Sequence, residues 1–349
     1  MVANTGTTST TYSDTGLKPG TQYNYRVTAI NSFVIGTSVS APTVYAFTVS
    51  STGNTDRFGI TKIHPTIQGG LEWTSQFDNG IARTFTGIDP KDPWSDNDHG
   101  DATYTINGKG KNTATGDYVR MYVHNPDGKT EWKENLEITA YITRVSETQE
   151  VSYSGTQIFT RTNHGVGYPE DNLLCPDRGY GAKPNDAGRW AFEKETAHHL
   201  DNGYADTADI SPPASVQFFK NGMPFNTPIG VKYIIYNLPG NQVKVELWAD
   251  LTNGTNGGDW HKVVETTDTG KNWGTGYDVC APGVDPAKPL IKSLVQAEDG
   301  NIPADVSVYF RHEYGTMIYE RMSVREIDLS SSGPTVTASP PAGTYVGPQ

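Results

Sequence analysis

Three segments of the sequence place polar and aromatic side chains at every second position. The alternating sets are Tyr118, Arg120 and Tyr122; Gln157, Phe159, Arg161 and Asn163, followed by His164; and Tyr309, Arg311 and Glu313, opposite Phe310, His312 and Tyr314. Because side chains alternate between the two faces of a strand, each set is expected to project from one side of its strand. Three such faces favour a binding surface, although Arg and Tyr also cover ordinary outer sheet faces.

These residue types suit chemistry beside a carboxylate. Arg and Gln can hold a carboxylate through charge-assisted hydrogen bonds, and His or Tyr can accept and return a proton. The roles that we assign are carboxylate binding by Gln157, Arg161 and Arg311, proton abstraction by His164, and protonation of the leaving group by Tyr309 or Tyr314. Tyr118, Arg120, Tyr122 and Asn163 are expected to line the same surface.

A second cluster of ionisable residues runs from Glu193 to His199. It could ligate a metal or supply a base that competes with His164. Adjacent histidines on an extended segment point apart, so His198 and His199 alone make a poor metal site, and a solvated loop is the favoured interpretation. Glu193, Glu195 and His198 are retained as substrate-binding candidates.

Residues 89–101 form a loop dense in oxygen ligands. Asp96, Asp98 and Asp101 could hold a structural Ca²⁺, and a plain acidic surface loop fits equally well. No cofactor is required for the chemistry considered. Three tryptophans in loops are candidates for stacking on sugar rings, namely Trp94, Trp260 and Trp273.

Composition excludes several classes of partner. The formal net charge of -12 over 349 residues argues against nucleic acid or an anionic membrane. No apolar run approaches the roughly 18 residues that a membrane span needs. Cys175 and Cys280 lie in loop-like sequence. One disulfide in an exported protein is the favoured interpretation, with two unpaired thiols as the alternative.

The elements that must position these residues are predicted to be strands. Charged residues make up only 19%, while 37 Gly and 22 Pro indicate many tight turns. The expected strands include Asp117–His124, Leu136–Val145, Gln157–Thr162, Trp190–Thr196, Val231–Tyr236, Val243–Ala249, Val306–Tyr314 and Met322–Ile327. Many strands separated by long polar loops predict an all-β chain with a large two-sheet jelly roll.

Both ends of the chain resemble parts of other modules. The N-terminal residues resemble the second half of a fibronectin type III domain through Leu17, Pro19, Gly20, Thr21, Tyr23, Arg26, Val27, Ala29 and Asn31. Tyr23 would be the tyrosine of the corner in that sandwich. Thr335–Tyr345 resembles the opening strand of a small β-sandwich appended to secreted carbohydrate-active enzymes. We therefore expect a partial fibronectin type III sandwich at 1–49, a linker at 50–55, the jelly roll at 56–329, and a linker with the start of a further β module at 330–349.

The central part resembles the concanavalin A-like jelly rolls that include polysaccharide lyases of the alginate-lyase type. Those lyases carry an Arg-containing strand, a Gln-x-His strand, and a late Tyr-x-Lys strand followed by a second Tyr. Tyr118–Tyr122, Gln157–His164 and Tyr309–Tyr314 occupy these places, with Arg311 replacing Lys and His164 seven residues after Gln157 instead of two. The resemblance implies an extracellular lyase that cleaves a uronic-acid polysaccharide by β-elimination.

Two other functions remain open at this point. A glycoside hydrolase needs two carboxylates about 5–10 Å apart, and Glu137, Glu193, Glu195 and Glu313 are candidates. A non-catalytic carbohydrate-binding or adhesion module would carry the same flanking modules. In each case we expect a secreted monomer that is part of a larger modular chain, with a polysaccharide as its partner and with neither nucleic acid nor a membrane.

Overall fold

The computed structural model describes two short backbone segments, 22–25 and 44–47, and most of the central region. The central segments are 54–97, 100–128, 130–151, 154–162, 175, 178–196, 215–270, 272–273, 279–280, 284–292 and 307–330. No described helix is long and apolar enough to cross a membrane.

Strands dominate the described residues. In chain order the elements are β1 (Gln22–Tyr25), β2 (Val44–Phe47), β3 (Glu72–Thr74), β4 (Arg83–Phe85), β5 (Ser95–Asp96), β6 (Thr103–Ile106), β7 (Lys111–His124), β8 (Leu136–Glu147), β9 (Gln157–Thr162), β10 (Gly179–Pro184), β11 (Arg189–Glu195), β12 (Ser215–Gln217), β13 (Ile229–Leu238), β14 (Gln242–Asp250), the 3-10 turn η2 (Thr255–Gly257), β15 (His261–Asp268) and β16 (Ser307–Glu326). This content confirms the all-β prediction.

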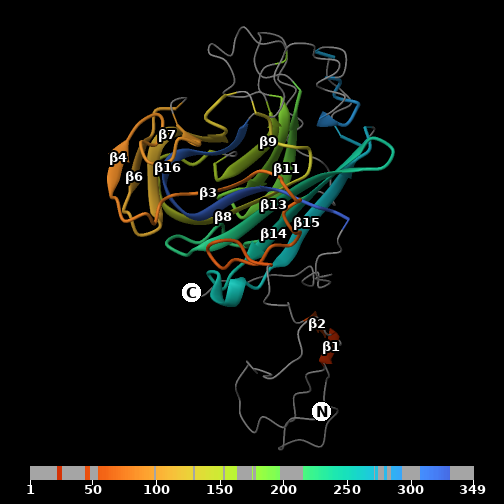
Figure 1. Cartoon of the computed structure of the whole chain (residues 1–349), viewed down its shortest axis with the longest axis horizontal. Coiled ribbons are helices and arrows are strands. Elements are labelled where there is room, and N and C mark those ends of the chain that lie inside the picture. The colour runs from red at the N-terminus through yellow and green to blue at the C-terminus, as the bar shows by residue number, and fades with distance from the viewer. Residues whose placement is uncertain are drawn as a thin grey trace, which may run out of the picture.

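Two long strands, β7 and β16, link two antiparallel sheets into one continuous structure (Figure 1). The 307–313 half of β16 lies between β9 and the 118–124 half of β7, and β10, β11 and β12 continue this first sheet. The 315–326 half of β16 pairs with β8, beyond which β13, β14 and β15 complete the second sheet. The arrangement is a jelly-roll sandwich, as predicted.

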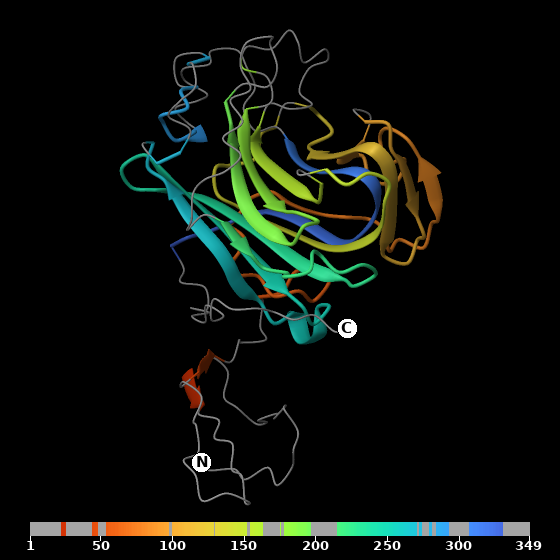
Figure 2. The same ribbon diagram turned by 180° about the vertical axis from the view of Figure 1, so that it is seen from behind.

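The core lies between the inner faces of the two sheets (Figure 2). Phe192 of β11 and Tyr233 of β13 meet across it, with ring centroids 6.3 Å apart. A buried ion pair also crosses it, because Lys194 Nζ of β11 lies 2.8 Å from Asp268 Oδ2 of β15. The Tyr180 hydroxyl of β10 donates to the same oxygen at 2.7 Å. Buried charges persist when they are paired and hydrogen-bonded, and here the pairing joins the two sheets.

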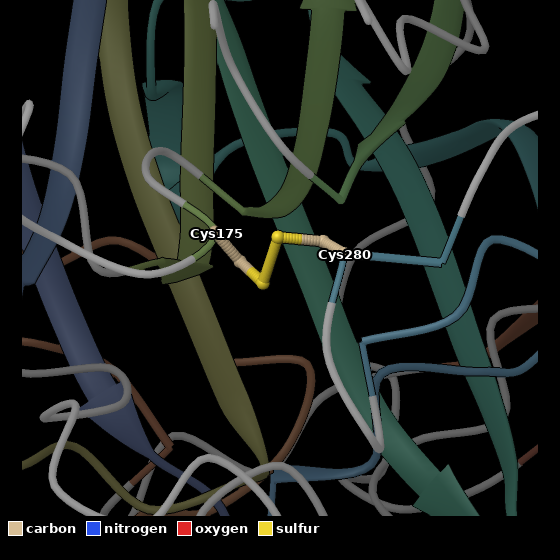
Figure 3. Close-up of a disulfide and its surroundings, with 2 residues drawn as sticks. All are labelled: Cys175 and Cys280. Carbon is tan, nitrogen blue, oxygen red and sulfur yellow. A yellow bond between two sulfur atoms is a disulfide. The ribbon is translucent and has the colours of Figure 1, made fainter.

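A disulfide ties the two loop cysteines together (Figure 3). Cys175 and Cys280 are bonded, with their Cα atoms 5.7 Å apart. The prediction of one disulfide is therefore confirmed, and the alternative of two unpaired thiols is wrong.

The N-terminal segment contributes one short ladder. β1 and β2 pair antiparallel, from Gln22 opposite Phe47 to Tyr25 opposite Val44, in a sheet of their own. This pairing by itself does not establish a fibronectin type III sandwich, which stays a prediction. Residues 331–349, where a further module was predicted, lie outside the described residues.

Candidate functional site

A row of side chains crosses the outer face of the first sheet, on the side away from the core. From β7 to β11 the register aligns Tyr122, Tyr309, Phe159, Gly181 and Glu193. The Phe159 and Tyr309 rings are parallel with centroids 4.9 Å apart, and Tyr122 lies 5.2 Å from Tyr309. A Cβ atom on Gly181 would lie 2.7 Å from the Phe159 ring, so glycine leaves the space that this ring occupies. The three buried rings form an aromatic floor.

The neighbouring row carries the charges. From β7 to β9 it consists of Arg120, Arg311 and Gln157. Lys183 follows on β10, directly after Ala182, which lies opposite Ile158. Arg311 Nε donates to Gln157 Oε1, and the Arg311 guanidinium lies 5.0 Å from the centroid of the Phe159 ring. Attraction to the ring and the bond to Gln157 fix the orientation of the guanidinium. We call the surface formed by Arg120, Gln157, Lys183, Arg311 and Glu313 the polar face.

Arg311 keeps donors for a ligand. Within the described part of the chain, its Nη1 and Nη2 atoms make no hydrogen bond or ion pair, and Gln157 Nε2 is buried without a partner. Burial on its own would lower the pKa of Arg311, but Tyr309 and the carboxylates of Glu195, Glu193 and Glu313 raise it. The guanidinium is therefore a permanent cation beside an unpaired amide donor, which suits a carboxylate ligand.

Two carboxyl groups lie beside this cation. Glu193 and Glu195 share the outer face of β11 as predicted, two positions apart on the strand. Lys183 Nζ lies 2.5 Å from Glu193 Oε2. Burial raises the pKa of Glu193, but the neighbouring Glu195 side chain and the charges of Lys183 and Arg311 outweigh it and lower that pKa.

The carboxyl candidates for a hydrolase lie in different environments. Glycosidases hold their catalytic carboxyl groups about 5–10 Å apart, and Glu193 is buried in an ion pair with Lys183. Glu137 is buried behind the second sheet, in ion pairs with Lys232 at 2.9 Å and Arg325 at 2.7 Å. Its backbone partners are the N–H groups of Ile63 and His64. Glu137 therefore anchors the 54–66 segment and does not line the polar face.

A pair of tyrosines borders the polar face. The hydroxyls of Tyr118 and Tyr314 lie 3.2 Å apart and the ring centroids 5.7 Å apart. Tyr118 is 49% exposed. Strand alternation predicted Tyr314 on the face opposite Arg311, which is wrong. A left-handed backbone at Tyr314, with φ of 49°, breaks the alternation and places its ring beside Tyr118.

Arg161 is held away from the other predicted carboxylate binders. Its φ of 55° coincides with a register shift between β9 and β16. Its Nη1 and Nη2 atoms donate to the carbonyls of Leu290 and Glu134 at 3.0 and 2.6 Å. A β-bulge re-aims the side chain at such a position. The predicted common face of Gln157, Phe159 and Arg161 is therefore wrong at Arg161.

Several of the predicted site residues lie outside the described part of the chain or away from the polar face. Asp98, Asn163, His164, His198 and His199 lie outside the described residues. Trp260 and Trp273 are buried against Tyr141 and Tyr180, so their prediction as exposed sugar platforms is wrong. Trp94 is half-buried beside Trp132, with centroids 5.7 Å apart.

The proposed calcium ligands engage other partners. Asp96 Oδ2 lies 3.1 Å from His124 Nε2, and Asp101 Oδ1 accepts the backbone N–H of Tyr118 at 2.8 Å. The described residues contain no group of three or more metal-ligating side chains. Calcium binding by this loop gains no support from the geometry.

The sequence analysis missed Lys183 of the polar face and His124 next to it. His124 extends the alternating set of Tyr118, Arg120 and Tyr122 by one step, and this continuation was a usable signal. Lys183 lies on β10, whose sequence Gly-Tyr-Gly-Ala-Lys-Pro lacks a pattern typical of a strand. Only the pairing of β10 with β9 and β11 reveals the place of Lys183.

Comparisons with known proteins give distant structural likenesses only. No family model matches the chain, and no curated protein matches it. The solved structures include the metal-free exoplasmic/lumenal domain of VIP36, at 7% identity and a TM-score of 0.39, covering 75% of this chain and 97% of that one. They also include the alginate lyase Aly36B bound to an alginate tetrasaccharide, at 11% identity and 0.38, covering 74% and 98%. The cellulose induced protein Cip1 matches at 11% identity and 0.35, covering 72% and 96%.

Proposed function

We propose that the chain is a polysaccharide lyase that cleaves a uronic-acid-containing polymer by β-elimination. The observation that carries this proposal is the pairing of Arg311 with Gln157, which leaves two guanidinium nitrogens and one amide nitrogen for a carboxylate. A uronate bound there would have its negative charge neutralised, which acidifies the proton on the adjacent carbon.

The remaining steps need a base and an acid near the bound uronate. A base removes the C5 proton, the electron pair forms the C4–C5 double bond, and the bond from C4 to the glycosidic oxygen breaks. The leaving oxygen then takes a proton. The Tyr314 hydroxyl, paired with Tyr118, is our choice for this acid because it borders the polar face. Tyr309 is fully buried in the aromatic floor, which favours Tyr314 over it. His164 remains the proposed base on sequence grounds.

A binding module is the second candidate. The Glu193–Lys183 and Glu313–Arg120 ion pairs stabilise a preformed surface, which a lectin-like module would also need. Export of the protein and a structural Ca²⁺ remain proposals from the sequence.

The test uses the purified chain with alginate, pectate, glucuronan, xylan and β-glucan. We expect ultraviolet absorbance from the unsaturated uronate formed by β-elimination on at least one uronate polymer. New reducing ends without that absorbance would indicate hydrolysis and contradict the proposal. Binding without any cleavage would indicate a binding module.

Arg311→Lys tests the carboxylate site directly. Lysine keeps the charge but loses the planar fork and the Nε bond to Gln157, so we expect kcat/KM to fall about a hundredfold or more. Arg321→Lys, on the same strand but bonded to Asn253 outside the polar face, is the matched control and should retain activity. Equal activity of both variants would remove Arg311 from the site.

A further inference from the structure

Glu313 carries a buried oxygen with no partner at the edge of the polar face. Its side chain is 6% exposed, and its Oε1 atom lies 2.8 Å from Arg120 Nη2. Across the described residues, no donor reaches its Oε2 atom. Glu313 follows Arg311 by two positions on β16, so both side chains project from the same face about 7 Å apart at their Cα atoms.

The neighbouring donors are already assigned. Arg120 Nη1 donates to the carbonyl of Val119 at 3.0 Å, and Arg311 Nε donates to Gln157. The polar face thus has one unpaired acceptor, Glu313 Oε2, beside unpaired donors on Arg311 and Gln157. Leaving a buried polar atom without a partner is unfavourable, so such an atom indicates a partner supplied from outside the chain.

We propose that Glu313 Oε2 accepts a hydrogen bond from a free ring hydroxyl of the same uronate whose carboxylate binds Arg311 and Gln157. The inference rests on the proposed function and names its substrate class, a polyuronate with unmodified ring hydroxyls. An O-acetyl group removes the hydroxyl donor and puts an acceptor oxygen beside a carboxylate oxygen. Glu313 is thereby a specificity residue that rejects O-acetylated polymer.

The ion pair with Arg120 explains why a glutamate occupies position 313. Arg120 orients Glu313, and it keeps one carboxylate oxygen engaged while the other stays available. A glutamine at the same position could turn its amide nitrogen toward the ligand. That nitrogen can donate to a hydroxyl oxygen or to an acetyl carbonyl, so the discrimination would be lost.

The experiment compares one polyuronate in three forms: unmodified, chemically O-acetylated, and acetylated then restored by mild alkali. Binding of each form is measured by isothermal titration calorimetry, with Tyr314→Phe added both to the wild-type chain and to Glu313→Gln so that the polymer stays intact during the titration. For the wild type we expect about tenfold or more weaker binding of the acetylated form, recovered after deacetylation. For Glu313→Gln we expect the two forms to bind within about threefold of each other.

Glu320→Gln is the matched control. Glu320 lies on the same strand, 3.9 Å from Lys111 Nζ and outside the polar face, so the variant should keep the wild-type ratio. If the wild type binds unmodified and acetylated polymer alike, or if Glu313→Gln keeps the wild-type ratio, the inference is wrong while the proposed function stands. If the wild type binds no polyuronate in any form, the proposed function itself fails. If Glu313→Gln does not fold, equal binding of unmodified and acetylated polymer by the wild type still overturns the inference.

Discussion

Tyr314 combines a strained backbone with a place at the edge of the polar face. A non-glycine residue at φ of 49° costs of the order of 1–3 kcal/mol, and such residues cluster at functional sites. Here the left-handed conformation brings the Tyr314 ring to the side of Tyr118. Sequence alternation found Tyr314 as a candidate but placed it on the wrong face, because the period of two assumes an extended backbone throughout.

Tyr314→Phe isolates the hydroxyl from the ring. The phenylalanine keeps the ring contact with Tyr118, so we expect an unchanged melting temperature and a kcat lower by about a hundredfold or more. Tyr236→Phe removes a hydroxyl bonded to Glu246 on the second sheet and should leave kcat unchanged. Full activity of Tyr314→Phe would assign the proton transfer to another residue.

At the scale of elements, the regular strands were predictable and their irregularities were not. Gln157–Thr162 matches β9, and the predicted Trp190–Thr196 strand differs from β11 by one residue at each end. The bulge at Arg161 could not be predicted from the sequence, because the hydrogen bonds that stabilise its position go to the distant carbonyls of Glu134 and Leu290. The sequence therefore predicted that Gln157 and Arg311 share a surface, and the structure pairs them, while tertiary contacts decided the direction of Arg161.

The packing of β10 against β9 depends on Gly181. The Cβ atom of Gly181→Ala would lie 2.7 Å from the Phe159 ring, so the ring or the strand must shift. We expect the free energy of unfolding to fall by about 1–3 kcal/mol, as measured by denaturant titration.

Phe159→Leu in the same chain gives the control. The smaller side chain relieves the clash, so the double variant should lose less stability than the sum of the two single losses. Strict additivity would show that Gly181 and Phe159 are not coupled.

At the scale of the whole molecule, a buried ion pair and a disulfide connect segments that are far apart in the sequence. The buried pair of Lys194 and Asp268 joins the sheets, and the disulfide joins two loops 105 residues apart in sequence. The jelly-roll architecture could be predicted from the number of strands and the composition of the turns. The order in which the strands pair could not be predicted, because it depends on contacts between residues far apart in the chain.

Replacing both cysteines tests the contribution of the disulfide to stability. Opening a loop of this length increases the conformational entropy of the unfolded chain, so Cys175→Ser/Cys280→Ser should lose up to about 4–5 kcal/mol of unfolding free energy. Guanidinium titration with and without reductant gives the measurement. The reduced wild type should match the variant, and an unchanged midpoint in either would contradict the prediction.

The length of β16, 20 residues, restricts which mutations this segment can tolerate. Insertion of one codon before Tyr309 would exchange the inward and outward positions in the segment that follows, so that Arg311 would turn to the interior and His312 to the outer face. Because β16 serves both sheets, neither sheet could absorb that slip alone. Natural and laboratory variation in this segment should therefore occur by substitution, while length changes concentrate outside the strand.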